Sequence, residues 1–257
     1  MDSRVVVAAR PKTALPPELR LIAGLKRASA LAAGVPPVPT GWRQLDRAIG
    51  GGLPGGRMTE IVAPLGGKTS LLMSLAAEAT AAGRNVGWID PRAALDVRGA
   101  EDAGVVLDRV LWVRPATMAQ AFRAADLVLG SEGFAVAILD LVGGGAGGPG
   151  WTRRGTSRRT AADDRVLLDT TAWNRLSRRA EACRVAIAVC TERPMAGATA
   201  ALGLDVRLSR PDWVRQHPDA PLTLAGAAVE VSVRHRKGGQ DGFVGCFPCE
   251  VGECWPW

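Results

Sequence analysis

The sequence predicts an α/β protein, with a mainly parallel central sheet that is extended by antiparallel strands. Apolar runs alternate with helical segments from residue 42 onward, and strands joined by helices pair in parallel with both faces buried. After residue 200, short strands follow one another without helices, which is typical of antiparallel pairing at the end of the same sheet. The chain has 257 residues, 47% of them hydrophobic, and this is enough to bury one large core.

The first expected element is an amphipathic helix over residues 18–33, because Leu21, Ile22 and Leu25 lie on one apolar stripe at helical spacing. The Pro-rich segment 35–41 follows it as an extended linker. Such a helix either packs on its own domain or is offered to a partner. The expected organisation is a helix and linker over residues 1–37, a core over 38–251 and a tail over 252–257.

The core is expected to alternate regularly between strands and helices. Strands are expected at residues 58–63, 85–90, 110–113, 134–140 and 184–191. Helices are expected at 69–82, 116–130 and 163–183. The later strands are expected at 206–209, 228–236 and 242–251.

One segment, residues 142–160, does not fit this order. It holds seven Gly, one Pro and four Arg, and it is too poor in apolar side chains to form a packed structure, so we expect a mobile basic loop. Two interpretations stay open, a solvated linker and a contact with single-stranded DNA in which Trp151 stacks on a base. The candidate phosphate contacts are Arg153, Arg154, Arg158 and Arg159.

Charge and cysteine content narrow the class of protein. The net charge of +7 favours polyanionic partners, and the basic residues are nearly all Arg. No apolar run approaches the roughly 18 residues of a membrane helix. Five cysteines, an odd number, argue against a disulfide scaffold and make the cytoplasm the expected location. No metal site is expected at Cys246, Cys249 and Cys254, because a closed zinc site needs a fourth ligand and both histidines are distant in sequence.

A strand that runs into a Gly-Gly-Lys-Thr turn and then a helix is the context in which a phosphate-binding loop forms. Here the turn consists of Gly66, Gly67, Lys68 and Thr69. The loop is one residue shorter than the pattern GxxxxGK[ST], and Ala63 stands in place of its first glycine. It therefore loses one or two charge-assisted hydrogen bonds to phosphate, worth about 1.5–3 kcal/mol each. No cofactor is expected, and weak binding of ATP with Mg²⁺ stays open.

Residues 38–64 resemble the entry to the ATPase core of bacterial RecA recombinases. The T-G-x-x-x-L-D element of that family is matched by Thr40, Gly41, Leu45 and Asp46, and its G-G-L-P-x-G-R element by residues 51–57. The likeness continues through residues 88–96, 134–140 and 229–237, so that it covers roughly 38–251, loosely after residue 140. It implies a RecA-like core without the C-terminal domain of those recombinases.

Departures from the RecA pattern imply a pseudo-ATPase. Arg92 stands where the recombinases have the glutamate that activates the attacking water, and an arginine cannot accept the proton of that water. Gly99 replaces an aromatic residue that stacks on adenine, near a retained Asp96, and Thr191 replaces a glutamine that senses the γ-phosphate. The DNA-binding loop after residue 193 is cut to a few small residues. The resemblance retains Asp140 at the magnesium position, and Arg234 and Arg236 match residues that reach across a filament interface.

A short, degenerate RecA-like chain with a Pro-hinged N-terminal helix resembles the ImuA family. That family accompanies ImuB and an error-prone polymerase in SOS-induced mutagenesis, so the resemblance implies a non-catalytic accessory of translesion synthesis. The expected partners are RecA, ImuB and the polymerase, with single-stranded DNA as a further candidate. The candidate partner interface consists of Leu21, Ile22, Leu25, Arg234 and Arg236.

Two alternatives belong to other functional classes. One is an ATP-dependent, DNA-stimulated strand-exchange or motor protein with a rearranged phosphate loop, motivated by Lys68, Thr69 and Asp140. The other is a simple DNA-binding module that uses the Gly/Arg loop.

Overall fold

A computed structural model describes residues 34–64, 66–142, 169–215, 217, 223–237 and 242–250. The chain divides into two compact units, Met1–Gly34 and Val35–Trp257, and the description below concerns the second. The helix expected at 18–33, the Gly/Arg loop beyond Val142 and the tail lie outside the described residues. In the described part, no helix is both long and apolar enough to cross a bilayer.

One eight-stranded sheet organises the second unit, in the order β3-β2-β4-β5-β1-β6-β7-β8. Its strands are β1 (Met58–Val62), β2 (Asn85–Ile89), β3 (Val110–Val113), β4 (Phe134–Asp140), β5 (Ala186–Thr191), β6 (Leu202–Val214), β7 (Thr223–Arg236) and β8 (Gly242–Glu250). All pairs from β3 through β6 are parallel, whereas β7 pairs antiparallel with both β6 and β8. The predicted fold class, a mainly parallel sheet with an antiparallel extension, is confirmed.

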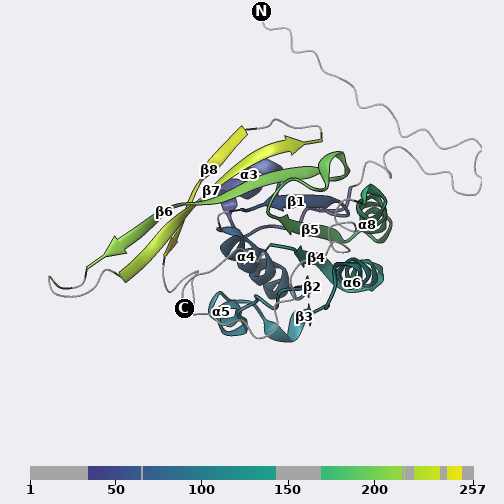
Figure 1. The fold of residues 1–257 in the computed structure, drawn as a ribbon, viewed down its shortest axis with the longest axis horizontal. Coiled ribbons are helices and arrows are strands. Elements are labelled where there is room, and N and C mark those ends of the chain that lie inside the picture. Colours follow the sequence, from purple (N-terminus) through teal and green to yellow (C-terminus); the bar gives the residue numbers. More distant parts are fainter. Residues whose placement is uncertain are drawn as a thin grey trace, which may run out of the picture. The chain divides into compact units, whose positions relative to one another are not determined.

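Helices cover both faces of the parallel part (Figure 1). Helices α4 (Lys68–Ala81) and α5 (Val97–Asp102) pack on one face, and α6 (Met118–Gly130) and α8 (Thr170–Cys183) pack on the other. Side chains therefore alternate between two apolar cores. In β5, for example, Ala188 belongs to the core under α4, and Ile187 and Val189 belong to the core under α6 and α8. The second core includes an edge-on contact of Phe122 with Trp173, whose ring centroids are 4.9 Å apart.

Strand and helix ends differ from expectation where local hydrogen bonds decide them. Helix α8 begins at Thr170, where the Asp169 carboxylate accepts a hydrogen bond from the backbone N–H of Thr171, and residues 163–168 of the predicted helix lie outside the described residues. Strand β5 begins at Ala186, because Arg184 ends α8 in the left-handed conformation with φ 61°. Strand β6 is longer than predicted, because β1 supplies partners at its start and β7 supplies them along its whole length.

The T-G-x-x-x-L-D element forms α3 (Arg43–Ile49), a short helix that was not predicted. The backbone N–H and the hydroxyl of Thr40 both donate to Oδ1 of Asp46, at 2.9 and 2.7 Å. Gly41 has φ 85°, and a Cβ there would lie 2.2 Å from Oγ of Ser74, so this approach of the chain to α4 needs glycine. Leu45 is fully buried. This element is a structural anchor for the entry to the core.

Candidate functional site

The predicted site residues meet where the parallel strands end. Asp140 is the last residue of β4, Thr191 is the last residue of β5, and Lys68 opens α4 directly after the turn that follows β1. These strands are neighbours, with Asp140 paired to Cys190 and Val62 paired to Thr191. In sheets of this kind, ligands bind at the carboxyl ends of the strands. The location predicted for a nucleotide is therefore present in the fold.

Lys68 and Asp140 form a direct ion pair at this place. Nζ of Lys68 donates a hydrogen bond to Oδ2 of Asp140, and their side chains are 13% and 5% exposed. Burial raises the pKa of Asp140, and the neighbouring ammonium of Lys68 offsets only part of that rise. Burial alone would lower the pKa of Lys68, but the charge of Asp140 raises it above the ordinary value of 10.5. Lys68 was expected to bind phosphate and Asp140 to bind magnesium, and the structure pairs the two side chains with each other.

The turn before Lys68 lies close to the antiparallel strands. Gly67 caps α4 with φ 85°, and a Cβ added to it would come within 3.0 Å of Val229 Cγ1 and 3.2 Å of Val206 Cγ1. Gly66 is exposed and also has a positive φ, and Thr69 is exposed in the first helical turn. The glycines thus allow a tight turn that packs on β6 and β7.

A second turn, after β2, holds Arg92. The fully buried Asp90 accepts hydrogen bonds from the backbone N–H groups of Arg92 and Leu95, at 3.0 and 2.9 Å. Asp96 caps α5 by accepting from the backbone N–H of Arg98, and Gly99 is buried inside that helix. Asp90 therefore has a structural role in the turn, and Asp96 has one at the start of α5.

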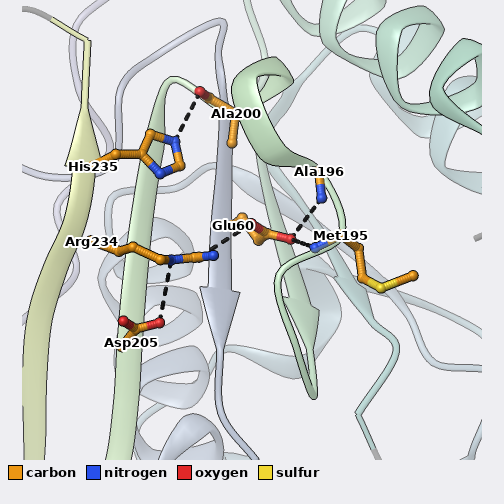
Figure 2. A network of polar contacts seen from close by, with 7 residues as sticks. All are labelled: Glu60, Met195, Ala196, Ala200, Asp205, Arg234 and His235. Atoms are coloured by element: carbon orange, nitrogen blue, oxygen red, sulfur yellow. Dashed lines mark hydrogen bonds and ion pairs between the residues drawn. The ribbon is translucent and has the colours of Figure 1, made fainter. Parts of the chain in front are cut away.

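Figure 2 shows a second polar cluster, which we call the Glu60 network: Glu60, Met195, Ala196, Asp205 and Arg234. The Glu60 side chain is fully buried, and its Oε1 accepts from the backbone N–H groups of Met195 and Ala196 at 2.5 and 2.8 Å. Nη2 of Arg234 lies 3.2 Å from Oε2 of Glu60, and Nε of Arg234 lies 3.3 Å from Asp205. The network joins β1, β6 and β7 to the segment between β5 and β6.

The residues that follow Arg234 are also engaged within the chain. Nε2 of His235 lies 3.2 Å from the carbonyl oxygen of Ala200, as Figure 2 shows. Nη1 of Arg236 donates to the carbonyl oxygen of Ala48 at 3.2 Å. Arg234 and Arg236, which were expected at a partner interface, thus both contact residues of their own chain.

Sequence reasoning did not single out Glu60 or Asp205. The available signal for Glu60 was a lone acid in the apolar strand Met58–Val62, inside a sheet expected to be buried on both faces. A charge at such a position requires a partner. Of the other predicted residues, Leu21, Ile22, Leu25 and the four loop arginines lie outside the described part of the chain.

We expect the protein to lose stability at alkaline pH. Burial raises the pKa of the Cys190 thiol well above its ordinary value of 9.0, and the pKa of Lys68 is also raised. Both groups release their protons more readily in the unfolded chain. The stability that Cys190 contributes below pH 9.0, and that Lys68 contributes below pH 10.5, is therefore lost as the pH rises through the folded pKa values. For each group, the free energy of unfolding then falls by up to about 1.4 kcal/mol per pH unit.

Urea unfolding between pH 8 and 11 measures this loss. The sequence has no Tyr, so the other side chains that titrate in this range are four Cys and three Lys. Cys190→Ala should remove the part of the decline that begins near pH 9, and Lys68→Met should remove the part above pH 10.5. A decline that is unchanged in both variants would show that other groups cause it.

Comparison with known proteins adds a partial match. The family described as RecA N-terminal domain matches residues 24–147. Protein RecA of Desulfotalea psychrophila is 41% identical over 110 residues, which are 42% of this chain and 31% of that protein. Protein RecA of Marinobacter nauticus is 42% identical over 110 residues, 42% of this chain and 32% of that protein. The chain spans about a third of the length of these relatives, and it is RecA-like in fold and, over residues 24–147, in sequence.

Proposed function

We propose that this RecA-like chain is a non-catalytic accessory protein of damage-induced mutagenesis, of the ImuA type. It contacts RecA and modulates or inhibits the RecA filament, and it contacts ImuB and the error-prone polymerase in the cytoplasm. In this proposal the chain is a pseudo-ATPase, and its RecA-like surface serves protein contacts.

The observation that carries the proposal is the state of the buried carboxylates. In the described part of the chain these are Glu60, Asp90 and Asp140. Glu60 binds two backbone N–H groups and Arg234, Asp90 binds two backbone N–H groups, and Asp140 binds Lys68. A general base must be free to approach the attacking water and take its proton. Donors of the chain already contact each of these buried carboxylates, so catalysis would require these contacts to change, and this supports a structural role over hydrolysis.

Two further residues support the proposal that the chain does not hydrolyse ATP. Arg92 occupies the turn after β2, where the RecA resemblance places the catalytic glutamate, and a guanidinium accepts no proton. Thr191 is buried at the end of β5, and within the described residues its hydroxyl has no hydrogen-bond partner. Its short side chain replaces the glutamine that the resemblance assigns to sensing the γ-phosphate.

The intramolecular contacts of Arg234 and Arg236 bear on filament assembly. In the RecA recombinases that this chain resembles, the residues at these two positions complete the nucleotide site of the neighbouring protomer. Here Arg234 is 22% exposed and holds two carboxylates, and Arg236 holds a carbonyl of α3. A protomer that joins a RecA filament without completing its neighbour's site would cap or weaken that filament. This is the mode of action that we propose.

The test is the single-strand-dependent ATP turnover of RecA, titrated with this protein. We expect turnover to fall at substoichiometric amounts, because one capping protomer stops a whole filament end. The triple variant Leu21→Asp/Ile22→Asp/Leu25→Asp should abolish the effect, because it places charges on the apolar stripe of the predicted helix.

The matched control is Ala23→Asp/Ala30→Asp, which puts acids on the opposite side of the same predicted helix and should inhibit like wild type. Inhibition that survives in the triple variant would remove the helix as the RecA contact. No effect of the wild-type protein on RecA turnover would remove RecA as the target and leave ImuB as the partner to test.

The alternative enzyme proposal rests on the retained Lys68, Thr69 and Asp140 at the carboxyl edge of the sheet. If it holds, the protein binds ATP with Mg²⁺ at micromolar concentration, and Lys68→Ala abolishes that binding. Titration calorimetry on the wild-type protein alone discriminates the two, because the pseudo-ATPase proposal expects binding that is near-millimolar or weaker.

A further inference from the structure

We propose that the outer face of α8 is a binding surface for a nucleic-acid phosphate backbone, centred on Arg175 and Arg178. This surface is distinct from the Lys68–Asp140 pair at the carboxyl edge of the sheet. The inference is independent of the proposed contacts with RecA and ImuB.

The pattern of burial defines this face. Trp173, Leu176 and Ala180 are buried against the sheet and α6, so the opposite side of α8 points to solvent. Arg178 lies opposite the buried stripe, and Arg175 lies beside it one turn earlier. Both are exposed, and they lie about 4.5 Å apart along the helix axis, at about 1.5 Å per residue.

The flanks of the face account for the other charges of α8. On one side Glu181 is paired with Arg57 at 3.1 Å, so this acid is already neutralised. On the other side the guanidinium of Arg179 covers Gly130 at the end of α6, since a Cβ added there would lie 2.1 Å from its Nη2. Arg179 thus has a packing role. Within the described part of the chain, the guanidinium groups of Arg175 and Arg178 take part in no ion pair or hydrogen bond, so these two residues are the available cations of this face.

The composition between the arginines favours nucleic acid over protein as the occupant. The exposed neighbours on this face are Thr171, Asn174 and Ala182, which are small or polar. Protein interfaces are enriched in Trp, Tyr and Arg anchors, and among its described residues this face has arginines without any aromatic or large apolar anchor. Phosphate contacts need only guanidinium, hydroxyl and amide groups, which this face supplies. The net charge of +7 adds long-range attraction to a polyanion.

The experiment measures binding of the full chain to a fluorescently labelled oligo(dT) of 30 nucleotides by anisotropy, at several salt concentrations. We expect Arg175→Ala/Arg178→Ala to weaken binding about tenfold or more at 0.1 M salt. The log–log salt slope should fall by about 1.4, since each phosphate contact on a single strand contributes about 0.7. Both side chains are exposed, so the fold should be retained, which circular dichroism checks.

Arg43→Ala/Arg47→Ala is the matched control. It removes two exposed arginines from α3, with the same change in net charge, and should alter affinity less than twofold. Equal losses in the two variants would overturn the proposal, because net charge alone would then explain binding. Loss of binding in Arg153→Ala/Arg154→Ala with full binding in the α8 variant would also overturn it and assign the contact to the loop. Competition by poly-glutamate as effective as that by unlabelled oligo(dT) would overturn it in favour of an acidic protein partner.

Discussion

Replacing Glu60 by alanine is expected to lower the free energy of unfolding by about 3–5 kcal/mol, because breaking a buried ion pair leaves its partner without compensation. Among the described residues, Arg234 would keep its ion pair with Asp205 alone, and the backbone N–H groups of Met195 and Ala196 would lose their acceptor. Urea unfolding at pH 7 measures the change. Hydrogen exchange should also accelerate in the segment between β5 and β6, because that carboxylate joins this segment to β1.

The matched control is Glu181→Ala, which removes an acid from a second pair with arginine. Its side chain and that of Arg57 are 57% and 51% exposed, so this change should cost less than about 1 kcal/mol. Glu60→Gln should fall between the two, because it keeps an acceptor for the backbone and loses the charge. Equal small losses for Glu60→Ala and Glu181→Ala would mean that water enters the network and that the segment is held by other contacts.

Replacing Lys68 by methionine is expected to destabilise the protein by about 3 kcal/mol or more, because it leaves the buried Asp140 without its cation. The double variant Lys68→Met/Asp140→Leu should regain most of this loss, since apolar side chains of similar volume can replace a buried pair at little cost. Chemical denaturation of the four proteins of this double-mutant cycle measures the coupling. Thr69→Ala, an exposed neighbour in the same turn, should stay within about 0.5 kcal/mol of wild type.

The same variants separate a structural pair from a catalytic one. If the chain is a pseudo-ATPase, the double variant still inhibits RecA turnover, because the pair only stabilises the fold. If the chain uses ATP, the double variant is stable but no longer binds or hydrolyses ATP. Strictly additive losses in the cycle would show that Lys68 and Asp140 do not depend on each other.

The regular part of the fold was predictable because its periodicity is strong. Residues 134–140 form an apolar run that ends in an aspartate, and the strand has these bounds. Helices α3 and α5, in contrast, have seven and six residues. Their formation depends on local hydrogen bonds, from the Thr40 hydroxyl to Asp46 beside α3 and from the backbone N–H of Arg98 to Asp96 at the start of α5, and periodicity does not detect so short a helix.

The candidate site was predictable in its location and not in its connections. A Gly-Gly-Lys-Thr turn between a strand and a helix indicates the carboxyl edge of a sheet, and Lys68 lies there. Its pairing with Asp140, 72 residues later, depends on β4 and β1 both lying beside β5. The contacts of Glu60 with Met195 and Arg234 span 135 and 174 residues. Such pairs follow from strand order, which local sequence patterns do not determine.

The position of β1 between β5 and β6 also has a consequence for synthesis on the ribosome. Met58 pairs with Ile187, so the ribosome must add roughly 130 residues after β1 before the neighbouring strand β5 is synthesised. At about 5–20 residues per second, this leaves an apolar strand without its partner for several seconds or longer. Nascent chains should therefore need chaperone protection until β5 emerges. A chain that ends before β5 would lack the neighbour of its central strand, and premature termination should yield an insoluble product.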